Sequence, residues 1–206
     1  METGFLIKSF LTFFTIIDPI GGVPFFLSIT AGYSDVERKM IALKASLTAF
    51  ITLFLFLWIG KYLLSFFQIS VSSFKIAGGI LLFLIAMEML FGKTTQVKTT
   101  EKETLKIKEK EDVSIVPLGI PYLAGPGAIT TTIILGETSN LYTKLGLSGI
   151  IFLVILVTFL IFSQSSKISK LLGELGTKAV VRILGLILAS IAIEYIITGL
   201  KENFLV

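Results

Sequence analysis

The chain has 206 residues, of which 54% are hydrophobic and only 16% are charged, and its formal net charge is +4. Soluble domains carry roughly a quarter charged residues, so this composition excludes a water-soluble domain and predicts an all-α polytopic membrane protein with about six spans. Cysteine and histidine are both absent, which excludes thiol redox chemistry, Cys/His metal sites and Ser-His or Cys-His catalysis. No cofactor is expected, and lysines in short loops favour a role in membrane topology over nucleic-acid binding.

The first predicted span covers residues 5–31, and the sequence Ile-Asp-Pro-Ile-Gly-Gly-Val-Pro interrupts it at 17–24. Proline lacks an amide donor and glycine relaxes the backbone, so two of each within these eight residues end one helix and begin another. The candidate site residues of this first break are Asp18, Pro19, Gly21, Gly22 and Pro24.

Two uninterrupted spans are predicted next, over residues 41–64 and 74–91. Ser34 or Asp35 is the expected cap of the first of these helices. Residues 93–112 then alternate lysines with acidic residues, and this pattern predicts a solvated linker. The predicted organisation is therefore a first three-helix unit at 1–92, the linker at 93–112 and a second three-helix unit at 113–206.

The fourth predicted span covers residues 115–135 and contains a second break, while the fifth and sixth cover 145–162 and 179–198. The candidate site residues of the second break are Gly125, Pro126, Gly127, Thr130 and Thr131. Thr132 can supply a further hydroxyl at the start of the same half-helix.

A constant offset of 107 residues relates the two halves, since it carries Pro19 to Pro126, Gly78 to Gly185 and Leu81 to Leu188. An odd number of spans in each half places two such copies upside down relative to each other. This is the inverted-repeat plan of many secondary transporters.

The distribution of lysine and arginine predicts the orientation of the spans. Thirteen of these residues fall on one side, including the six linker lysines, and five fall on the other. Because cytoplasmic loops are enriched in positive charge, both termini are predicted outside and the linker 93–112 in the cytoplasm.

The two breaks predict one shared polar site at the middle of the membrane, because irregular backbone survives at that depth only where protein or a cavity surrounds it. The half-helix amino termini near Val23 and Ala128 favour an anion such as a carboxylate. Asp18 has two compatible interpretations. It pairs with a substrate ammonium or carries a coupled proton, or it caps the helix that follows.

Three motifs carry a resemblance to a known family. They are Ile-Asp-Pro-Ile-Gly-Gly-Val-Pro at 17–24, Ile-Ala-Gly-Gly-Ile-Leu-Leu at 76–82 and Pro-Tyr-Leu-Ala-Gly-Pro-Gly-Ala-Ile-Thr at 121–130. In order and spacing they resemble the MarC family of bacterial and archaeal inner-membrane proteins. The resemblance implies six spans in two inverted halves and, by similarity to the SnatA branch, transport of small neutral amino acids driven by an ion gradient. It also supports site roles for the candidate residues of both breaks.

The favoured function is a secondary transporter of a small zwitterion such as glycine or alanine, coupled to protons or sodium ions. The alternative is an exporter or drug-efflux protein of the same architecture. A membrane enzyme is disfavoured because Asp18 is the single ionisable residue near the centre of a span. A scaffold role leaves both breaks unexplained. Transport direction, coupling ion, substrate range and oligomeric state stay open at this point.

Overall fold

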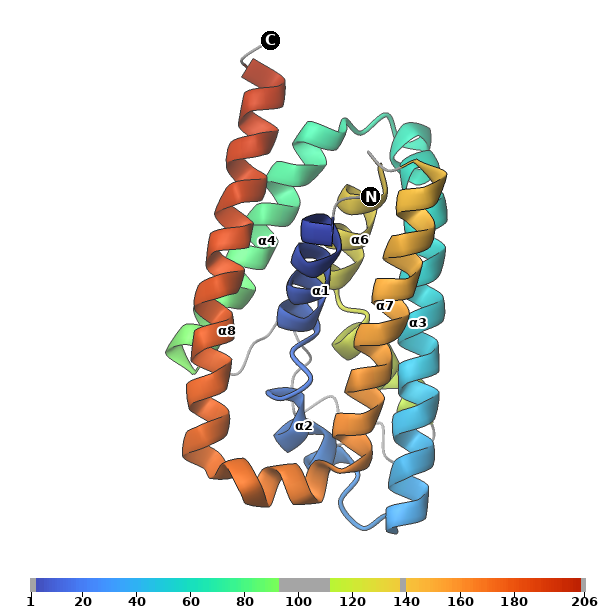
Figure 1. Cartoon of the computed structure of the whole chain (residues 1–206), viewed down its shortest axis with the longest axis vertical. Coiled ribbons are helices and arrows are strands. Elements are labelled where there is room, and N and C mark those ends of the chain that lie inside the picture. Colours follow the sequence, from blue (N-terminus) through green and yellow to red (C-terminus); the bar gives the residue numbers. More distant parts are fainter. Residues whose placement is uncertain (1–2, 93–111, 138–139, 205–206) are drawn as a thin grey trace.

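The computed structural model describes residues 3–92, 112–137 and 140–204, and these residues form an all-helical protein (Figure 1). Within these ranges four helices are long and apolar enough to cross a membrane, or six if each of two bent helix pairs counts as one span. The multi-pass helical architecture predicted from composition is confirmed. The four long helices are α3 (Asp35–Phe66), α4 (Val71–Phe91), α7 (Leu141–Ser163) and α8 (Ser165–Phe204).

Both predicted breaks are present as bends between short helices. In the first bent pair, α1 (Thr3–Ile17) meets α2 (Gly22–Ile29) at 44°. In the second, η1 (Ser114–Leu123) meets α6 (Pro126–Glu137) at 56°. Proline and glycine therefore interrupt both spans where the sequence predicts it.

The η1 segment differs from the regular half-helix expected before the second break. Val116 and Ile120 have extended backbone angles, with φ −124° and −135°. Each of them precedes a proline, Pro117 or Pro121, whose ring disfavours the helical conformation in the preceding residue. Two prolines four residues apart thus replace the helix by a wider, irregular coil.

The ends of the long helices follow local signals in the sequence. Ser34 and Glu37 form a capping box at the start of α3, which confirms the cap predicted there. The Ser70 hydroxyl accepts a hydrogen bond from the Ser73 amide at the start of α4, and Gly92 ends that helix with a left-handed backbone at φ 65°.

The first three spans run down, up and down in Figure 1, and the last three run up, down and up. Helix α4 packs along α8, while α3 packs along α7 and along both parts of the second bent pair. Helix α1 packs against α7 and α8. Of the predicted linker, residues 93–111 lie outside the described residues, and the proposed unit boundaries at 92 and 113 stay a prediction.

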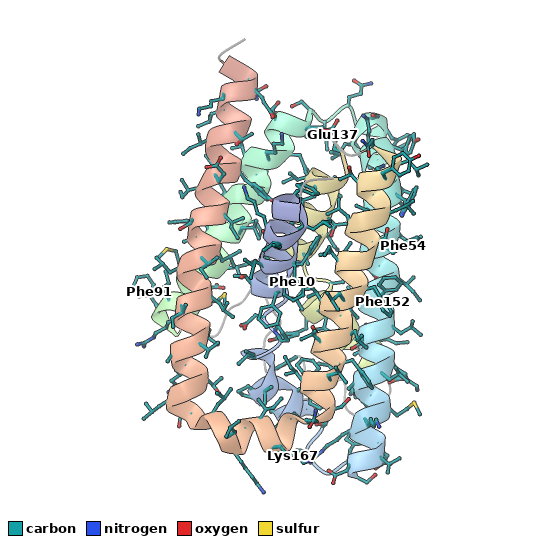
Figure 2. All side chains as sticks on the ribbon, viewed as in Figure 1. Phe10, Phe54, Phe91, Glu137, Phe152 and Lys167 are labelled. Atoms are coloured by element: carbon teal, nitrogen blue, oxygen red, sulfur yellow. The ribbon has the colours of Figure 1, made fainter. Side chains whose placement is uncertain are left out.

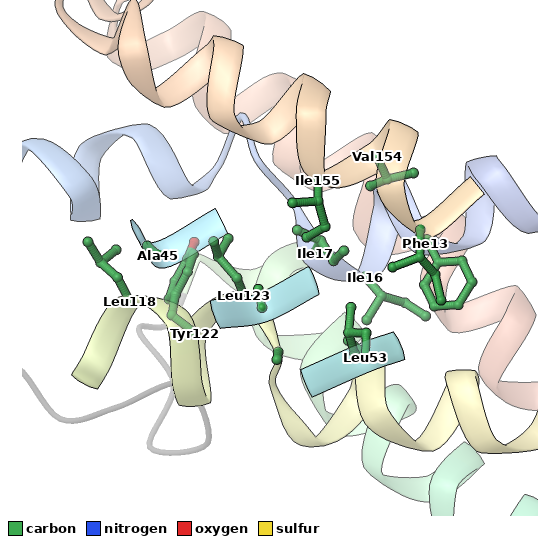
Figure 3. Close-up of a cluster of buried hydrophobic side chains, with 14 of the residues drawn as sticks. Phe13, Ile16, Ile17, Ala45, Leu53, Leu118, Tyr122, Leu123, Val154 and Ile155 are labelled. Atoms are coloured by element: carbon green, nitrogen blue, oxygen red, sulfur yellow. The ribbon is translucent and has the colours of Figure 1, made fainter. Parts of the chain in front are cut away.

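The core lies where the two bent pairs meet the long helices (Figure 3). Phe13, Phe26, Leu53, Leu82 and Leu123 are fully buried there. Large apolar side chains also cover the outside of the bundle (Figure 2), among them Leu47, Ile51 and Leu55 along α3. An apolar exterior of this kind fits a hydrocarbon environment.

Among the described residues, three ion pairs join the first half of the chain to the second. Lys44 lies 2.9 Å from Asp112, Lys61 lies 3.5 Å from Glu137, and Lys75 lies 2.6 Å from Glu202. The Lys75 side chain is only 9% exposed, against 44% for Glu202, so this pair is the most shielded from water. The Lys61–Glu137 and Lys75–Glu202 pairs lie near helix ends, while Lys44 lies nine residues inside α3.

The Asp112 pair predicts a dependence of stability on acid. Hydrogen bonds from the Ser114 hydroxyl and then from Lys44 lower the pKa of Asp112 from 3.8 to about 2. Because the folded protein holds this carboxyl in its charged form, the stabilisation is complete above the unfolded pKa and is lost as the pH falls towards 2. Thermal unfolding in detergent should show a constant advantage of the wild type over Asp112→Asn from pH 7 to 5. That advantage should shrink below about pH 4, and an advantage that persists unchanged at pH 2 contradicts the assignment.

Candidate functional site

Asp18 forms the turn of the first break. Its amide donates to the Phe14 carbonyl at 3.0 Å and ends α1, while its Oδ1 accepts from the Gly21 amide, also at 3.0 Å. The residue has φ 49°, a left-handed conformation that aspartate tolerates better than most side chains, and it is 3% exposed. The expected cap is therefore present in shifted form, since Gly21, and not Asp18, is the residue that precedes α2.

The two glycines of the first break permit close approach to their neighbours. A Cβ atom built on Gly21 would overlap the Asp18 carboxylate. A Cβ atom on Gly22 would lie 2.9 Å from the hydroxyl oxygen of Tyr122 and 3.0 Å from Cζ of Phe162. Real Cβ contacts are rarely so short, so Gly22 is needed because side chains from the second half press against its backbone.

The second break is followed directly by α6, whose first two residues are Pro126 and Gly127. Pro126 is the first residue of this helix, a position where its missing amide donor has no consequence. A Cβ atom on Gly127 would lie 2.8 Å from Leu82 and 3.2 Å from Ile85. Gly127 therefore allows α6 to pack closely on α4.

Three successive threonines follow on α6, and all are buried: Thr130 at 7% exposure, and Thr131 and Thr132 at 0%. The Thr132 hydroxyl donates to the Ala128 carbonyl at 2.7 Å. The Thr131 hydroxyl has no hydrogen-bond partner among the described residues. Tyr195 of α8 is close enough to interact with this hydroxyl, although the pair does not meet the usual distance and angle limits of a hydrogen bond. A buried hydroxyl without a partner is uncommon and marks a place where a polar ligand gains a contact.

Tyr122 connects the two breaks. It belongs to η1, yet its ring stacks on Phe25 of α2 with the ring centroids 4.7 Å apart, and its hydroxyl abuts Gly22. The tyrosine also interacts electrostatically with Asp18. Its place among the buried side chains is labelled in Figure 3. The sequence motif contained Tyr122 but assigned it no role; the available signal was a polar aromatic residue between the prolines of a broken span.

A small cavity lies beside the second break. It measures about 10 Å³ and is lined by Ile16, Ile85, Pro121, Tyr122, Leu123 and residues 125–128. That volume is enough for about one water molecule. The candidate residues of the first break do not belong to its described lining, so a polar site shared by the two breaks stays a prediction.

Some of the candidate site residues line this cavity and others do not. Gly125, Pro126 and Gly127 line it. Asp18, Pro19, Gly22, Thr130 and Thr131 are buried nearby in the same bent spans without lining it. Pro24 is exposed on α2, so its side chain lies outside the packed region between the breaks.

A larger cleft of about 230 Å³ lies at one end of α3. Charged side chains of Glu37, Lys44 and Asp112 line it together with Tyr33 and Met40. None of the candidate residues of either break contributes to its described lining. This cleft is therefore separate from the two breaks and lies beside the Lys44–Asp112 ion pair.

Comparison with known proteins places this architecture in a family. The family model described as MarC family integral membrane protein matches residues 3–204. The UPF0056 membrane protein YvbG of Bacillus subtilis is 39% identical over 207 residues, covering 99% of this chain and 98% of the relative. A UPF0056 membrane protein of Buchnera aphidicola is 40% identical over 199 residues, with 96% and 92% covered. YhcE of Escherichia coli is 36% identical over 198 residues, also with 96% and 92% covered.

No solved structure matches the chain. The family match nevertheless extends over both bent pairs and all four long helices, and the printed names of the three relatives describe membrane proteins. The chain therefore belongs to the MarC family and is an integral multi-pass membrane protein.

Proposed function

We propose that this protein is a secondary transporter of small neutral amino acids, of the glycine and alanine type, driven by a proton or sodium gradient. The observation that carries the proposal is the meeting of two broken spans around Tyr122. There a buried carboxylate, a buried hydroxyl without a partner and closely approached glycines lie in adjoining segments. Broken helices that meet inside the membrane are the usual site of substrate and ion binding in secondary transporters.

The chemistry of the site suits a zwitterion. The amino ends of α2 and α6 carry a partial positive charge, which favours a substrate carboxylate. At α2 the amides of residues 21–23 already bond to Asp18 and Ile20, so a carboxylate there would have to replace these bonds. Asp18 supplies the negative charge for a substrate ammonium or for a coupled proton. Tyr122, Phe162 and Leu82 pack directly against the glycines of the two breaks and leave no space for even one added carbon atom there. A site that opens between these closely packed surfaces would favour a substrate with a very small side chain.

The 10 Å³ cavity requires an opening motion before any amino acid can enter. We infer that the two halves form an inverted repeat and rock against each other. The packing supports this inference, since the helices that the offset makes equivalent are also packing partners: α3 with α7, and α4 with α8. The opposite directions of the first and last three spans are also what an inverted repeat requires (Figure 1).

The remaining parts of the proposal concern placement in the cell. We propose the inner membrane, with both termini outside and residues 93–112 in the cytoplasm, because lysine and arginine collect on the linker side. Lys39, Lys44, Lys167 and Lys170 belong to that side.

The test is exchange of labelled glycine in proteoliposomes that are loaded with unlabelled glycine. Exchange does not depend on an ion gradient or on the net direction of transport, so with protons and sodium ions present on both sides it isolates binding and translocation. We expect rapid exchange that excess alanine inhibits and that a bulky drug leaves unchanged. Imposed proton and sodium gradients then identify the coupling ion.

Two results would change this assignment. Exchange of the drug, with no competition by alanine, supports the exporter alternative. If neither glycine nor the drug is exchanged by protein that still unfolds cooperatively in detergent, both the amino acid transporter and the exporter assignments are overturned.

A further inference from the structure

A short helix lies across one end of the molecule, where the sequence predicts only a separator between two spans. Residues 165–172, the first part of α8, run across the lower end of Figure 1 between α7 and the rest of α8. Gly173 ends this segment with φ 62° and ψ −176°. That conformation is readily available to glycine alone, so this residue turns the chain from a crosswise into a spanning direction.

One face of the crosswise helix packs on the protein and the other faces outwards. Ser165 is 3% exposed, and Ile168 and Ser169 are half-buried. Lys167 and Lys170 are both exposed. Leu171 beside them is 85% exposed. Its outward face therefore combines two cations with an apolar side chain.

The charges on this face have no counterpart in the described part of the chain. The ion pairs found there include Lys178 with Glu174, but neither Lys167 nor Lys170 takes part in one. Lys39 is exposed at the start of α3, which lies at the same end of the molecule (Figure 1). Lys167 is labelled at this end in Figure 2. Asp35 and Glu37 are exposed in the same turn as Lys39, so the unbalanced positive charge of this end is carried by Lys167 and Lys170.

The depth of the helix follows from its neighbours. Helix α7 ends at Ser163, one residue before Gln164 and the crosswise segment, and the apolar part of α8 follows after it. A helix between the ends of two spans lies at the boundary of hydrocarbon and water. There, leucines enter the acyl region and lysine stems extend to the headgroups.

We propose that residues 165–175 form an interfacial element that binds the headgroups of anionic phospholipids. Lys167 and Lys170 contact the lipid phosphates, and Leu171 and Leu175, which is 84% exposed, insert among the chains. The element holds the start of α8 at the membrane surface. This role goes beyond transport and does not depend on the substrate.

The absence of cysteine from the natural chain makes the test direct. Leu171→Cys is labelled with a fluorophore and reconstituted, and its quenching by brominated phosphatidylglycerol is compared with that by brominated phosphatidylcholine. We expect stronger quenching by the anionic lipid, with a preference that falls about fivefold for each lysine removed in Lys167→Gln and Lys170→Gln. High salt should weaken the preference.

The matched control is Lys8→Gln with Lys201→Gln, which removes the same charge from two exposed lysines outside the crosswise helix and should leave the preference unchanged. Equal quenching by the two lipids in the parent protein overturns the proposal. A preference for the anionic lipid that persists when Lys167→Gln and Lys170→Gln are combined also overturns the proposal. Efficient disulfide formation between two copies of the unlabelled Leu171→Cys protein would overturn it too, because it would assign the surface to a second copy of the chain.

Discussion

An Asp18→Asn protein should fold like the wild type and exchange glycine about 10- to 100-fold more slowly. Asparagine retains an oxygen that accepts from the Gly21 amide and also tolerates the left-handed backbone of this position. The substitution therefore removes the charge and leaves the turn. The expected loss corresponds to one hydrogen bond to a charged group, about 1.5–3 kcal/mol.

The measurements are the initial rate of exchange and the midpoint of thermal unfolding, on the same preparation. Asp35→Asn is the matched control, because Asp35 is exposed in the first turn of α3 and loses the same charge. Exchange at the wild-type rate in Asp18→Asn would show that the carboxylate serves only the turn. Asp18→Ala should lower the unfolding midpoint in addition, since it leaves the Gly21 amide without its acceptor.

The position of the breaks was predictable because the responsible forces act over a few residues. Pro19 and Pro126 each lack an amide donor, and Gly21 or Gly127 follows within two residues. A regular helix is therefore kinked or broken at both places. The same locality explains the capping box of Ser34 and Glu37, whose partners are three residues apart.

The contents of the site were less predictable, because they depend on contacts between distant segments. Tyr122 reaches Gly22 and Phe25 across a separation of about one hundred residues. A sequence pattern reports that this residue lies in a broken span, but not which way its ring turns. The polar site shared by the two breaks stays a prediction for the same reason. Polarity of the motif says nothing about the neighbouring Ile16 and Ile85 side chains that line the cavity.

The long helices extend beyond the apolar runs that mark the predicted spans. The cap at Ser34 predicted the start of α3, but no such signal was recognised for α8, which begins at Ser165, well before its apolar stretch. Helical structure continues into the interface wherever the local sequence permits it, and the non-helical backbone of Gly173 separates the crosswise part of α8 from its spanning part. Hydropathy alone therefore could not reveal the crosswise helix.

A Gly78→Ala substitution should destabilise the protein by about 1–3 kcal/mol, the usual effect of overpacking a close contact. A Cβ atom at this position of α4 would overlap the Cγ2 methyl of Thr130 on α6. Threonine has only two common χ1 rotamers within a helix, so the overlap is relieved either by a change of the Thr130 rotamer, which moves its hydroxyl, or by separation of the two helices. Thermal unfolding in detergent should shift down by about 2–4 °C for each kcal/mol.

The matched control is Gly149→Ala on α7, where a Cβ atom meets no other atom within 4 Å. Alanine favours the helix over glycine, so this variant should be neutral or more stable. Thr130→Ser removes the obstructing methyl and keeps the hydroxyl, so it should recover most of the loss when combined with Gly78→Ala. If the stability change of the double variant equals the sum of the changes in Gly78→Ala and Thr130→Ser, the two residues do not interact. Recovery of stability together with glycine exchange would show that the Thr130 hydroxyl, and not its methyl, serves the site, because only the methyl has been removed.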